Sequence, residues 1–399
     1  MKAVFVNHCH PEMPHVCGLR LGRFASAMAG RGHRVVLICE AFPRGSACPD
    51  PAVLGDTLAG HDWSEPFVLP CPPMGHRRAA EARTGVLPAG WRHLVIGASF
   101  AFDNGMFGDW QAGAARYFPA LVSDFGPDVV WSTFGNTDAW AIAQALAGRA
   151  KCPWVADFKD NWSAFLPAGF AGLMARRFGD AAQMTVLSEG HCDEADRWFN
   201  IRKTVLYSGV DAVSGGASPA PFRILLAGSV YDGRNLARLI GGIRRWLETG
   251  RASDVEFVYA GNDGDRVADA ARPLDGLCRV IVHGFIGLPD LAALQSGAAV
   301  NVYVQNDRNI FHHKCLELMA AARPVIALPD ESGETRRLAG EAGCSLFVCA
   351  DPDQVVDALE VIESGTLPPP DPEALDAFTW ARRAETLEAV LSAAVEGRR

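Results

Sequence analysis

Three observations predict an α/β fold made of two Rossmann-like domains. Short apolar runs, typical of strands buried in a parallel sheet, alternate with helical patterns along most of the chain. The 399 residues, 49% of them hydrophobic, are enough for two domains with separate cores. A stretch rich in Gly, Ser, Ala and Pro at 213–221 lies between two apolar strands, as a linker would. We expect domains at 1–212 and 221–372, followed by a terminal helical segment at 373–399.

Charge and cysteine usage limit the class of protein. A net charge of -9 argues against a general nucleic-acid binder, which needs a basic surface. The eleven cysteines form no C-x-x-C pair and several lie in apolar runs, which indicates reduced thiols in the cytoplasm. The N-terminal apolar run is too short for a signal peptide, and no stretch approaches the ~18 apolar residues of a membrane span. We therefore expect a soluble protein that does not bind nucleic acid.

The first domain opens as strand, loop, helix and strand. Strands are predicted at 3–6 and 35–39, and a loop at 8–18 precedes the helix between them. The buried stripe of that helix recurs at i, i+3, i+4 and i+7, as Leu21, Phe24, Ala25 and Met28. The loop lacks a G-x-G-x-x-G fingerprint, which argues against a nicotinamide dinucleotide site. Its histidines, His8, His10 and His15, could bind a metal, but no acidic partner is fixed nearby and we expect none.

Residues 42–120 are rich in proline, and we expect few regular elements there. An apolar, aromatic segment at 91–107 lies within this region. It is flanked by four arginines, Arg77, Arg78, Arg83 and Arg92. Such a segment could rest on an anionic membrane surface. The alternative is an apolar helix packed under neighbouring loops.

Alternation then resumes, with strands at 128–132, 153–157 and 184–188 and helices at 138–147 and 189–199. The turn at 157–162 follows one of these strands at the carboxyl edge of the sheet, where ligands of open α/β sheets gather. Asp157 and Asp160 in this turn could act as a base or bind acceptor hydroxyls. An aspartate beside a lysine in a turn is, however, more often structural.

The second domain repeats the pattern. Strands are predicted at 222–228, 255–261, 279–284, 299–304, 325–328 and 346–349. Helices are predicted around Leu236–Ile243 and at 291–295, 314–322, 336–342, 354–362 and 373–395.

The most informative stretch is 312–327. Its helix buries a stripe of Leu316, Met319 and Ala320, so Lys314 and Glu317 share the other face. The positive end of the helix favours a phosphate, and the Glu317 carboxylate could accept hydrogen bonds from two ribose hydroxyls. The alternative is an ordinary i,i+3 Lys–Glu surface pair.

This stretch resembles the "K-x-x-E-x-x-A-x-x-x-P-V-I-A" signature of GT-B glycosyltransferases, especially the large retaining family four, also called glycosyltransferase group 1. The resemblance implies two Rossmann-like domains facing a cleft, with the terminal helix crossing back to the first. It places the donor ribose at Glu317 and the donor phosphates near His313 and Lys314. Many members carry a second glutamate near the sugar where this chain has Asn309.

Weaker matches extend the resemblance over most of the chain apart from residues 42–120. The "R-G-H-x-V" run at 31–35 and the "F-T-W" at 378–380 are similar to family motifs, and the "D-F-K-D-N-W" turn at 157–162 resembles the family's "D-x-R-D-x-W". By this resemblance Gly18 approaches donor phosphate and acceptor, and the Gly228 loop with Arg234 contacts the diphosphate. The loop after Gly284 holds the nucleotide base, with Phe285 and Ile286 as candidates and core packing as an equal alternative.

The resemblance implies a glycosyltransferase that moves a sugar from a nucleoside diphosphate sugar to a glycan or lipid-linked acceptor in cell-surface polysaccharide synthesis. It implies no metal or other cofactor, and a location in the cytoplasm or peripherally at the inner face of the membrane. Two alternatives remain open. One is a non-catalytic GT-B partner subunit, motivated by Asn309 and by the lack of a convincing base. The other is a nucleotide-sugar epimerase on the same fold.

Overall fold

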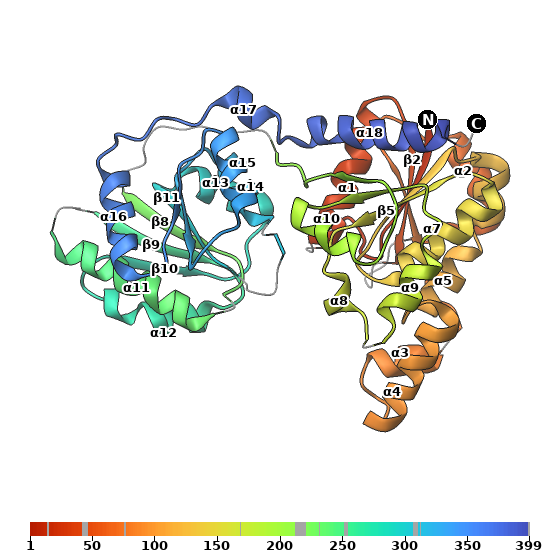
Figure 1. Cartoon of the computed structure of the whole chain (residues 1–399), viewed down its shortest axis with the longest axis horizontal. Helices are drawn as coiled ribbons and strands as arrows, with labels where there is room; N and C mark the ends of the chain where they lie inside the picture. The colour runs from red at the N-terminus through yellow and green to blue at the C-terminus, as the bar shows by residue number, and fades with distance from the viewer. Residues whose placement is uncertain are drawn as a thin grey trace. The chain divides into compact units, whose positions relative to one another are not determined.

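The computed structural model describes residues 1–13, 16–41, 47–75, 77–167, 169–211, 221–230, 232–250, 254–305, 310–311 and 313–397. The chain forms two compact units, each a parallel sheet flanked by helices (Figure 1). Unit 1 is Met1–Ser208 with Trp380–Arg399, and unit 2 is Gly209–Thr379. Asn309, His15 and the predicted linker up to residue 220 lie outside the described residues.

The sheet of unit 1 has seven parallel strands in the order β3-β2-β1-β4-β5-β6-β7. They are β1 (Lys2–Val6), β2 (Arg34–Glu40), β3 (Phe67–Cys71), β4 (Val129–Thr133), β5 (Trp154–Phe158), β6 (Gln183–Val186) and β7 (Lys203–Val205). Strands β1 and β4 are neighbours, with Ala3 opposite Val129. The strand order therefore reverses between β1 and β4, the position where open α/β sheets place a ligand site.

Helical segments of unit 1 follow the strands on both faces. They are α1 (Val16–Gly30), η1 (Pro51–Val53), α2 (Leu54–Ala59), α3 (Arg77–Arg83), α4 (Ala89–Ala98), η2 (Ser99–Asp103), α5 (Gly108–Ala115), α6 (Phe118–Ala120), η3 (Leu121–Phe125), α7 (Thr137–Ala150), α8 (Trp162–Phe165), α9 (Ala171–Arg177), α10 (Glu189–Asp196) and α18 (Trp380–Glu396).

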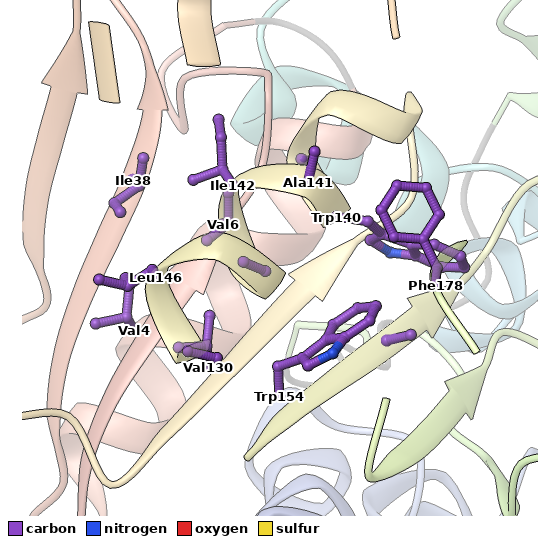
Figure 2. Close-up of a cluster of buried hydrophobic side chains, with 14 of the residues drawn as sticks. Val4, Val6, Ile38, Val130, Trp140, Ala141, Ile142, Leu146, Trp154 and Phe178 are labelled. Atoms are coloured by element: carbon purple, nitrogen blue, oxygen red, sulfur yellow. The ribbon is translucent and has the colours of Figure 1, made fainter. Parts of the chain in front are cut away.

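The two faces of this sheet carry separate cores because successive strand residues point to opposite sides. Val4, Val6 and Ile38 pack under α7, whose Ile142 and Leu146 cover them, while Trp140 of the same helix packs beside Trp154 and Phe178 (Figure 2). The alternate residues of the same strands pack against α1 and α18, through Leu21, Phe24, Leu387 and Leu391 among others. The continuous apolar runs of the sequence reflect this burial on both faces.

The C-terminal segment differs from the single helix predicted at 373–395. Helix α17 (Pro372–Asp376) ends before Thr379, which forms an isolated bridge with Val210, and α18 starts only at Trp380. Trp380, Leu387 and Leu391 are buried in the core of unit 1. Helix α18 therefore completes the unit formed by the first 208 residues.

The expectation of few regular elements at 42–120 is wrong, because this region contains the edge strand β3 and several helices. Pro70 is tolerated in β3 because an edge strand has hydrogen-bonding groups that pair with no neighbour. The buried Asp138 carboxylate of α7 anchors the region by accepting hydrogen bonds from the backbone N–H groups of Met106 and Phe107, at 3.0 and 2.9 Å. Such a long-range contact leaves no periodic pattern in the sequence.

Unit 2 has six parallel strands in the order β10-β9-β8-β11-β12-β13. They are β8 (Phe222–Ala227), β9 (Val255–Ala260), β10 (Arg279–His283), β11 (Val300–Val304), β12 (Val325–Leu328) and β13 (Leu346–Val348). The helical segments are α11 (Gly233–Glu248), α12 (Gly264–Ala271), η4 (Arg272–Leu274), α13 (Leu288–Ser296), α14 (Lys314–Ala320), α15 (Gly333–Glu341), α16 (Pro352–Glu363) and α17. Strand order reverses between β8 and β11, so the residues after these two strands share the position where a ligand is expected.

Candidate functional site

Lys314 and Gly228 meet at the β8–β11 reversal of unit 2. The Lys314 ammonium donates a hydrogen bond to the carbonyl oxygen of Ala227, the last residue of β8. Gly228 follows with φ of +87°, and a Cβ placed on it would lie 2.0 Å from the Lys314 nitrogen. Only glycine therefore lets this cation approach the strand end. Two predicted donor-binding residues that are 86 positions apart in the sequence are thus brought together.

Residues 228 and 230, which follow β8, are held by three side chains, those of Tyr259 in β9, of Asp263 just before α12 and of Arg266 in α12. The Tyr259 hydroxyl donates to the Gly228 carbonyl at 2.8 Å. The Asp263 carboxylate accepts from the Val230 N–H at 2.8 Å, and Arg266 donates to the Val230 carbonyl at 2.6 Å. No local pattern in the sequence marks these three residues, because each contacts backbone groups 31 to 36 positions away. The backbone at residues 228 and 230 is therefore fixed by its neighbours.

Glu317 lies one turn into α14 and pairs with His313 at 3.2 Å. Burial opposes ionisation of Glu317, but the hydrogen bond from His313 and the charges of His313 and Lys314 outweigh it and lower the pKa of the carboxyl group. Burial lowers the pKa of the Lys314 ammonium, and the negative charge of Glu317 offsets part of this decrease. The partner of Glu317 is thus His313, and the Lys314 ammonium is bound to the strand end. This arrangement differs from an ordinary surface pair of Lys314 with Glu317.

Three further predicted donor contacts, Arg234, Gly284 and Phe285, lie at the same carboxyl edge of the sheet. Arg234 is in the first turn of α11 with 89% of its side chain exposed, and its nearest carboxylate is Asp232 at 3.8 Å. Gly284 follows β10, and Phe285 after it is 64% exposed. Exposure on this scale shows that Phe285 is not packed in the core of unit 2.

Gly18 in unit 1 lies in the first turn of α1, which begins at Val16. The prediction that it ends a loop is therefore wrong by about one turn. A Cβ on Gly18 would lie 2.4 Å from the carbonyl oxygen of His10. The glycine thus allows α1 to start directly against the loop that follows β1.

Asp157, at the carboxyl end of β5, is fully buried in an ion pair with Arg20 of α1. Its two oxygens accept from the guanidinium at 3.0 and 3.3 Å, and one also accepts from the Thr185 hydroxyl at 2.7 Å. Arg20 in turn donates to the Ser208 hydroxyl at 2.8 Å and to the Leu206 carbonyl at 3.0 Å. These contacts favour the structural alternative for Asp157.

Sequence reasoning missed Arg20, although its position carried a signal. It lies four residues before Phe24, on the apolar face of α1, and its guanidinium lies 5.0 Å from the centre of the Phe24 ring. A cation on an apolar helix face is expected to have a buried partner.

Asp160 is the more exposed of the two predicted carboxylates. It pairs at 3.0 Å with Lys159, whose side chain is only 6% exposed. Burial raises the pKa of Asp160, and the charge of Lys159 opposes the shift. Asp160 therefore remains the candidate of the two that a substrate could reach.

Among the residues that the structure describes, no three His, Cys, Asp or Glu side chains gather as metal ligands. Within the same residues, no helix is long and apolar enough to cross a membrane.

Comparison with known families decides the assignment. Residues 17–206 match the model of the glycosyl transferase 4-like domain, and residues 221–363 match that of the glycosyl transferases group 1. The chain is a GT-B glycosyltransferase. No curated protein sequence matches it significantly.

Solved GT-B structures have the same fold over nearly the whole chain. Anabaena HepE in complex with UDP-glucose is 14% identical with a TM-score of 0.56, covering 100% of this chain and 98% of that one. The lipopolysaccharide outer core galactosyltransferase WaaB is 13% identical with a TM-score of 0.59, covering 100% of both chains. A putative UDP-N-acetylglucosamine 2-epimerase from Listeria monocytogenes is 12% identical with a TM-score of 0.58, covering 99% and 97%. At these identities the likeness shows the fold.

The Asp157–Arg20 pair generates a prediction about stability. Asp157→Asn should destabilise the glycosyltransferase by about 3–5 kcal/mol, because it leaves the Arg20 charge buried without its counter-ion. Urea unfolding at pH 7 measures this free energy. Asp160→Asn is the matched control and should cost less, because Asp160 is partly exposed. An Asp157→Asn variant that unfolds like the wild type but has lost transfer activity would show that Asp157 is catalytic.

Proposed function

We propose that the protein transfers a sugar from a nucleoside diphosphate sugar to a hydroxyl group of an acceptor, with the donor bound at the carboxyl edge of unit 2. The observation that carries this proposal is the meeting of Lys314 with the glycine-containing end of β8 at the strand-order reversal. A cation fixed beside a tight glycine turn suits an anionic ligand that approaches the backbone closely. The UDP-glucose complex of Anabaena HepE supports a nucleotide-sugar ligand on this fold.

The donor-side residues have distinct chemical roles in this proposal. The leaving diphosphate gains negative charge as the glycosidic bond to it breaks. Lys314 and Arg234, with Arg266 beside the loop, stabilise that charge, and the loop contacts to Tyr259 and Asp263 hold its backbone in place beforehand. Glu317 accepts hydrogen bonds from the ribose hydroxyls, and the lowered pKa of its carboxyl group keeps it ionised for that role. Phe285 contacts the base.

The acceptor side is proposed in unit 1, near Asp160 and the first turn of α1. The acceptor is a glycan or a lipid-linked sugar used in cell-surface polysaccharide synthesis. The fold shared with the lipopolysaccharide galactosyltransferase WaaB supports this acceptor class. The Listeria epimerase shares the fold as well, so a donor panel incubated with and without acceptor separates the alternatives. Transfer of the sugar to the acceptor would support the proposal. Isomerisation of the donor in the absence of an acceptor would support the epimerase, and donor binding without any turnover would support a non-catalytic partner subunit.

Glu317 gives a direct test of the donor site. Hydrogen bonds to a charged group contribute about 1.5–3 kcal/mol each, so Glu317→Ala should weaken binding of the preferred nucleoside diphosphate by tenfold or more, and Glu317→Gln by less. A 2′,3′-dideoxy analogue should bind the wild type poorly and lose little more on mutation, because the partner of the carboxylate is absent. Isothermal titration calorimetry measures all of these affinities.

The matched control for Glu317 is Glu341→Ala in α15, which removes an exposed i,i+4 partner of Arg337 in the same unit. It should leave the affinity unchanged. If wild-type protein binds the dideoxy analogue as tightly as the normal nucleotide, or if Glu317→Ala unfolds the protein, the ribose assignment is wrong.

We also propose that the helical segment 77–103 contacts an anionic membrane surface, where a lipid-linked acceptor is presented. Helices α3 and α4 extend at one end of unit 1 (Figure 1), and α4 has no buried residue. Trp91 and Leu94, three positions apart on α4, are 66% and 67% exposed. This exposure opposes the alternative of a helix packed under loops.

Two of the flanking arginines, Arg83 and Arg92, form hydrogen bonds within the protein. Arg92 donates to the Ala82 carbonyl oxygen at 3.1 Å. Arg83 donates to both oxygens of Asp109, at 3.0 and 2.7 Å, and lies over the Phe107 ring. The expectation that Arg83 contacts a membrane is therefore wrong. Arg83 instead anchors α3 to residues 107 and 109 of the same unit. The contact then depends on the apolar side chains of α4.

The membrane proposal predicts that the protein co-sediments with vesicles containing anionic lipids. The double variant Trp91→Ala, Leu94→Ala should lose most of this binding, because the apolar side chains that would enter the interface are gone. Leu288→Ala, an exposed apolar residue of unit 2, is the control and should sediment like the wild type. Equal sedimentation of the double variant and the wild type would contradict the proposal.

A further inference from the structure

Two cysteines, Cys9 and Cys17, meet beside the end of β1. The side-chain amide of Asn7 donates to the carbonyl oxygens of both, at 3.1 and 3.0 Å, and so fixes the two backbone segments next to each other. The two thiols are hydrogen-bonded to each other. Neither cysteine is in a disulfide in the structure.

A buried lysine completes this cluster. The Lys159 ammonium lies 2.6 Å from the Cys17 sulfur and 3.0 Å from the Asp160 carboxylate. Burial alone would lower the pKa of Lys159, but Asp160 and Cys17 outweigh it, so the pKa is raised and the ammonium keeps its charge. A cation in contact with a thiol stabilises the thiolate, which is the form that reacts with oxidants.

The two cysteines have different environments. Cys17 is in direct contact with the ammonium. The Cys9 thiol donates its hydrogen bond to the Cys17 sulfur, and this bond, together with burial, raises the pKa of Cys9 well above its ordinary value, so Cys9 stays protonated. Cys39 and Cys71 show the common alternative, since burial raises the pKa of both thiols and no cation contributes. The Cys9–Cys17 pair is thus arranged as a nucleophile with a neighbouring second thiol.

We propose that Cys17 and Cys9 form a peroxide-reactive pair, in which Cys17 is oxidised first and Cys9 then closes a disulfide. The Cys17 sulfur attacks one oxygen of hydrogen peroxide, the O–O bond breaks, and the products are the Cys17 sulfenic acid and one water. The Cys9 sulfur then attacks the Cys17 sulfur, the S–O bond breaks, and the hydroxyl group leaves as a second water with the Cys9 proton. Two thiols are oxidised to one disulfide while one peroxide is reduced to two waters.

This modification site goes beyond sugar transfer and does not rest on it. Cys17 lies in the first turn of α1 next to Gly18, and Lys159 lies next to Asp160. A disulfide would take the Cys17 sulfur away from Lys159 and change the partners of that ammonium.

The sequence makes the disulfide simple to detect. Trypsin cleaves after Lys2 and Arg20, so Cys9 and Cys17 fall in a single peptide, 3–20. The fully reduced chain is treated with hydrogen peroxide, alkylated with N-ethylmaleimide, digested and analysed by mass spectrometry. The expected product is peptide 3–20 that carries no alkyl group and is two hydrogens lighter than the reduced peptide. It should form at least ten times faster than Cys278 is oxidised, as measured by the loss of alkylation at Cys278. Dithiothreitol added before alkylation should restore the doubly alkylated peptide.

Variants separate the two roles. In Cys9→Ser the disulfide cannot form, and dimedone should trap a sulfenic acid on Cys17. Lys159→Met should slow Cys17 oxidation at least tenfold, whereas Lys159→Arg should retain much of the rate. Cys278→Ser, which removes a partly exposed cysteine of unit 2, should leave the oxidation of peptide 3–20 unchanged. Circular dichroism establishes that each variant is folded.

The proposal is overturned if peptide 3–20 is oxidised no faster than Cys278. It is also overturned if dimedone traps no adduct on Cys17 in Cys9→Ser, a result that does not depend on whether the Lys159 variants fold. A Lys159→Met protein that is folded and reacts at the wild-type rate would contradict the role of the lysine.

Discussion

The hydrogen bond from the Lys314 ammonium to the end of β8 is the contact on which the proposed donor site of this glycosyltransferase depends. It needs β8 and β11 to be neighbours, so that the strand order reverses where α14 approaches. It also needs Gly228, because any side chain there would occupy the position of the ammonium. His313 and Glu317 lie at the start of α14 and are therefore held near this contact. Arg234 lies in the first turn of α11, the helix that follows β8.

Unit 1 uses a buried cation in a different way. Arg20 joins the end of β5 to residues 206 and 208, and its charge is matched by the fully buried Asp157. Lys159 has the partly exposed Asp160 and the thiol of Cys17 as partners. A buried pair whose hydrogen bonds are satisfied has a positioning role, whereas a buried cation beside a thiol changes the reactivity of that thiol. The carboxyl edge of this sheet thus combines a rigid ion pair with a chemically reactive cluster.

The sequence predicted the parts of this molecule that depend on local patterns. Strands buried on both faces appear as continuous apolar runs, and the sequence singled out Gly228 and Lys314, which the structure brings together. Arg20 stood out as a cation on the apolar face of α1, but no local pattern identifies its partner, because Asp157 is 137 positions away. The contact between Lys159 and Cys17 likewise joins residues that are 142 positions apart. Proline does not exclude a strand at Pro70, because β3 is an edge strand that tolerates it. The break before Trp380 follows from the bridge between Val210 and Thr379, which helical periodicity does not encode.

The central claim is that Lys314 holds the diphosphate of the donor, and calorimetry with two ligands tests it most directly. Titration of wild-type and Lys314→Met protein with the preferred nucleoside diphosphate and with its nucleoside separates the phosphate contribution from the rest. The account predicts that Lys314→Met weakens diphosphate binding at least tenfold, about 1.4 kcal/mol, and leaves nucleoside binding nearly unchanged. Equal losses for both ligands, or no loss for the diphosphate, would contradict it.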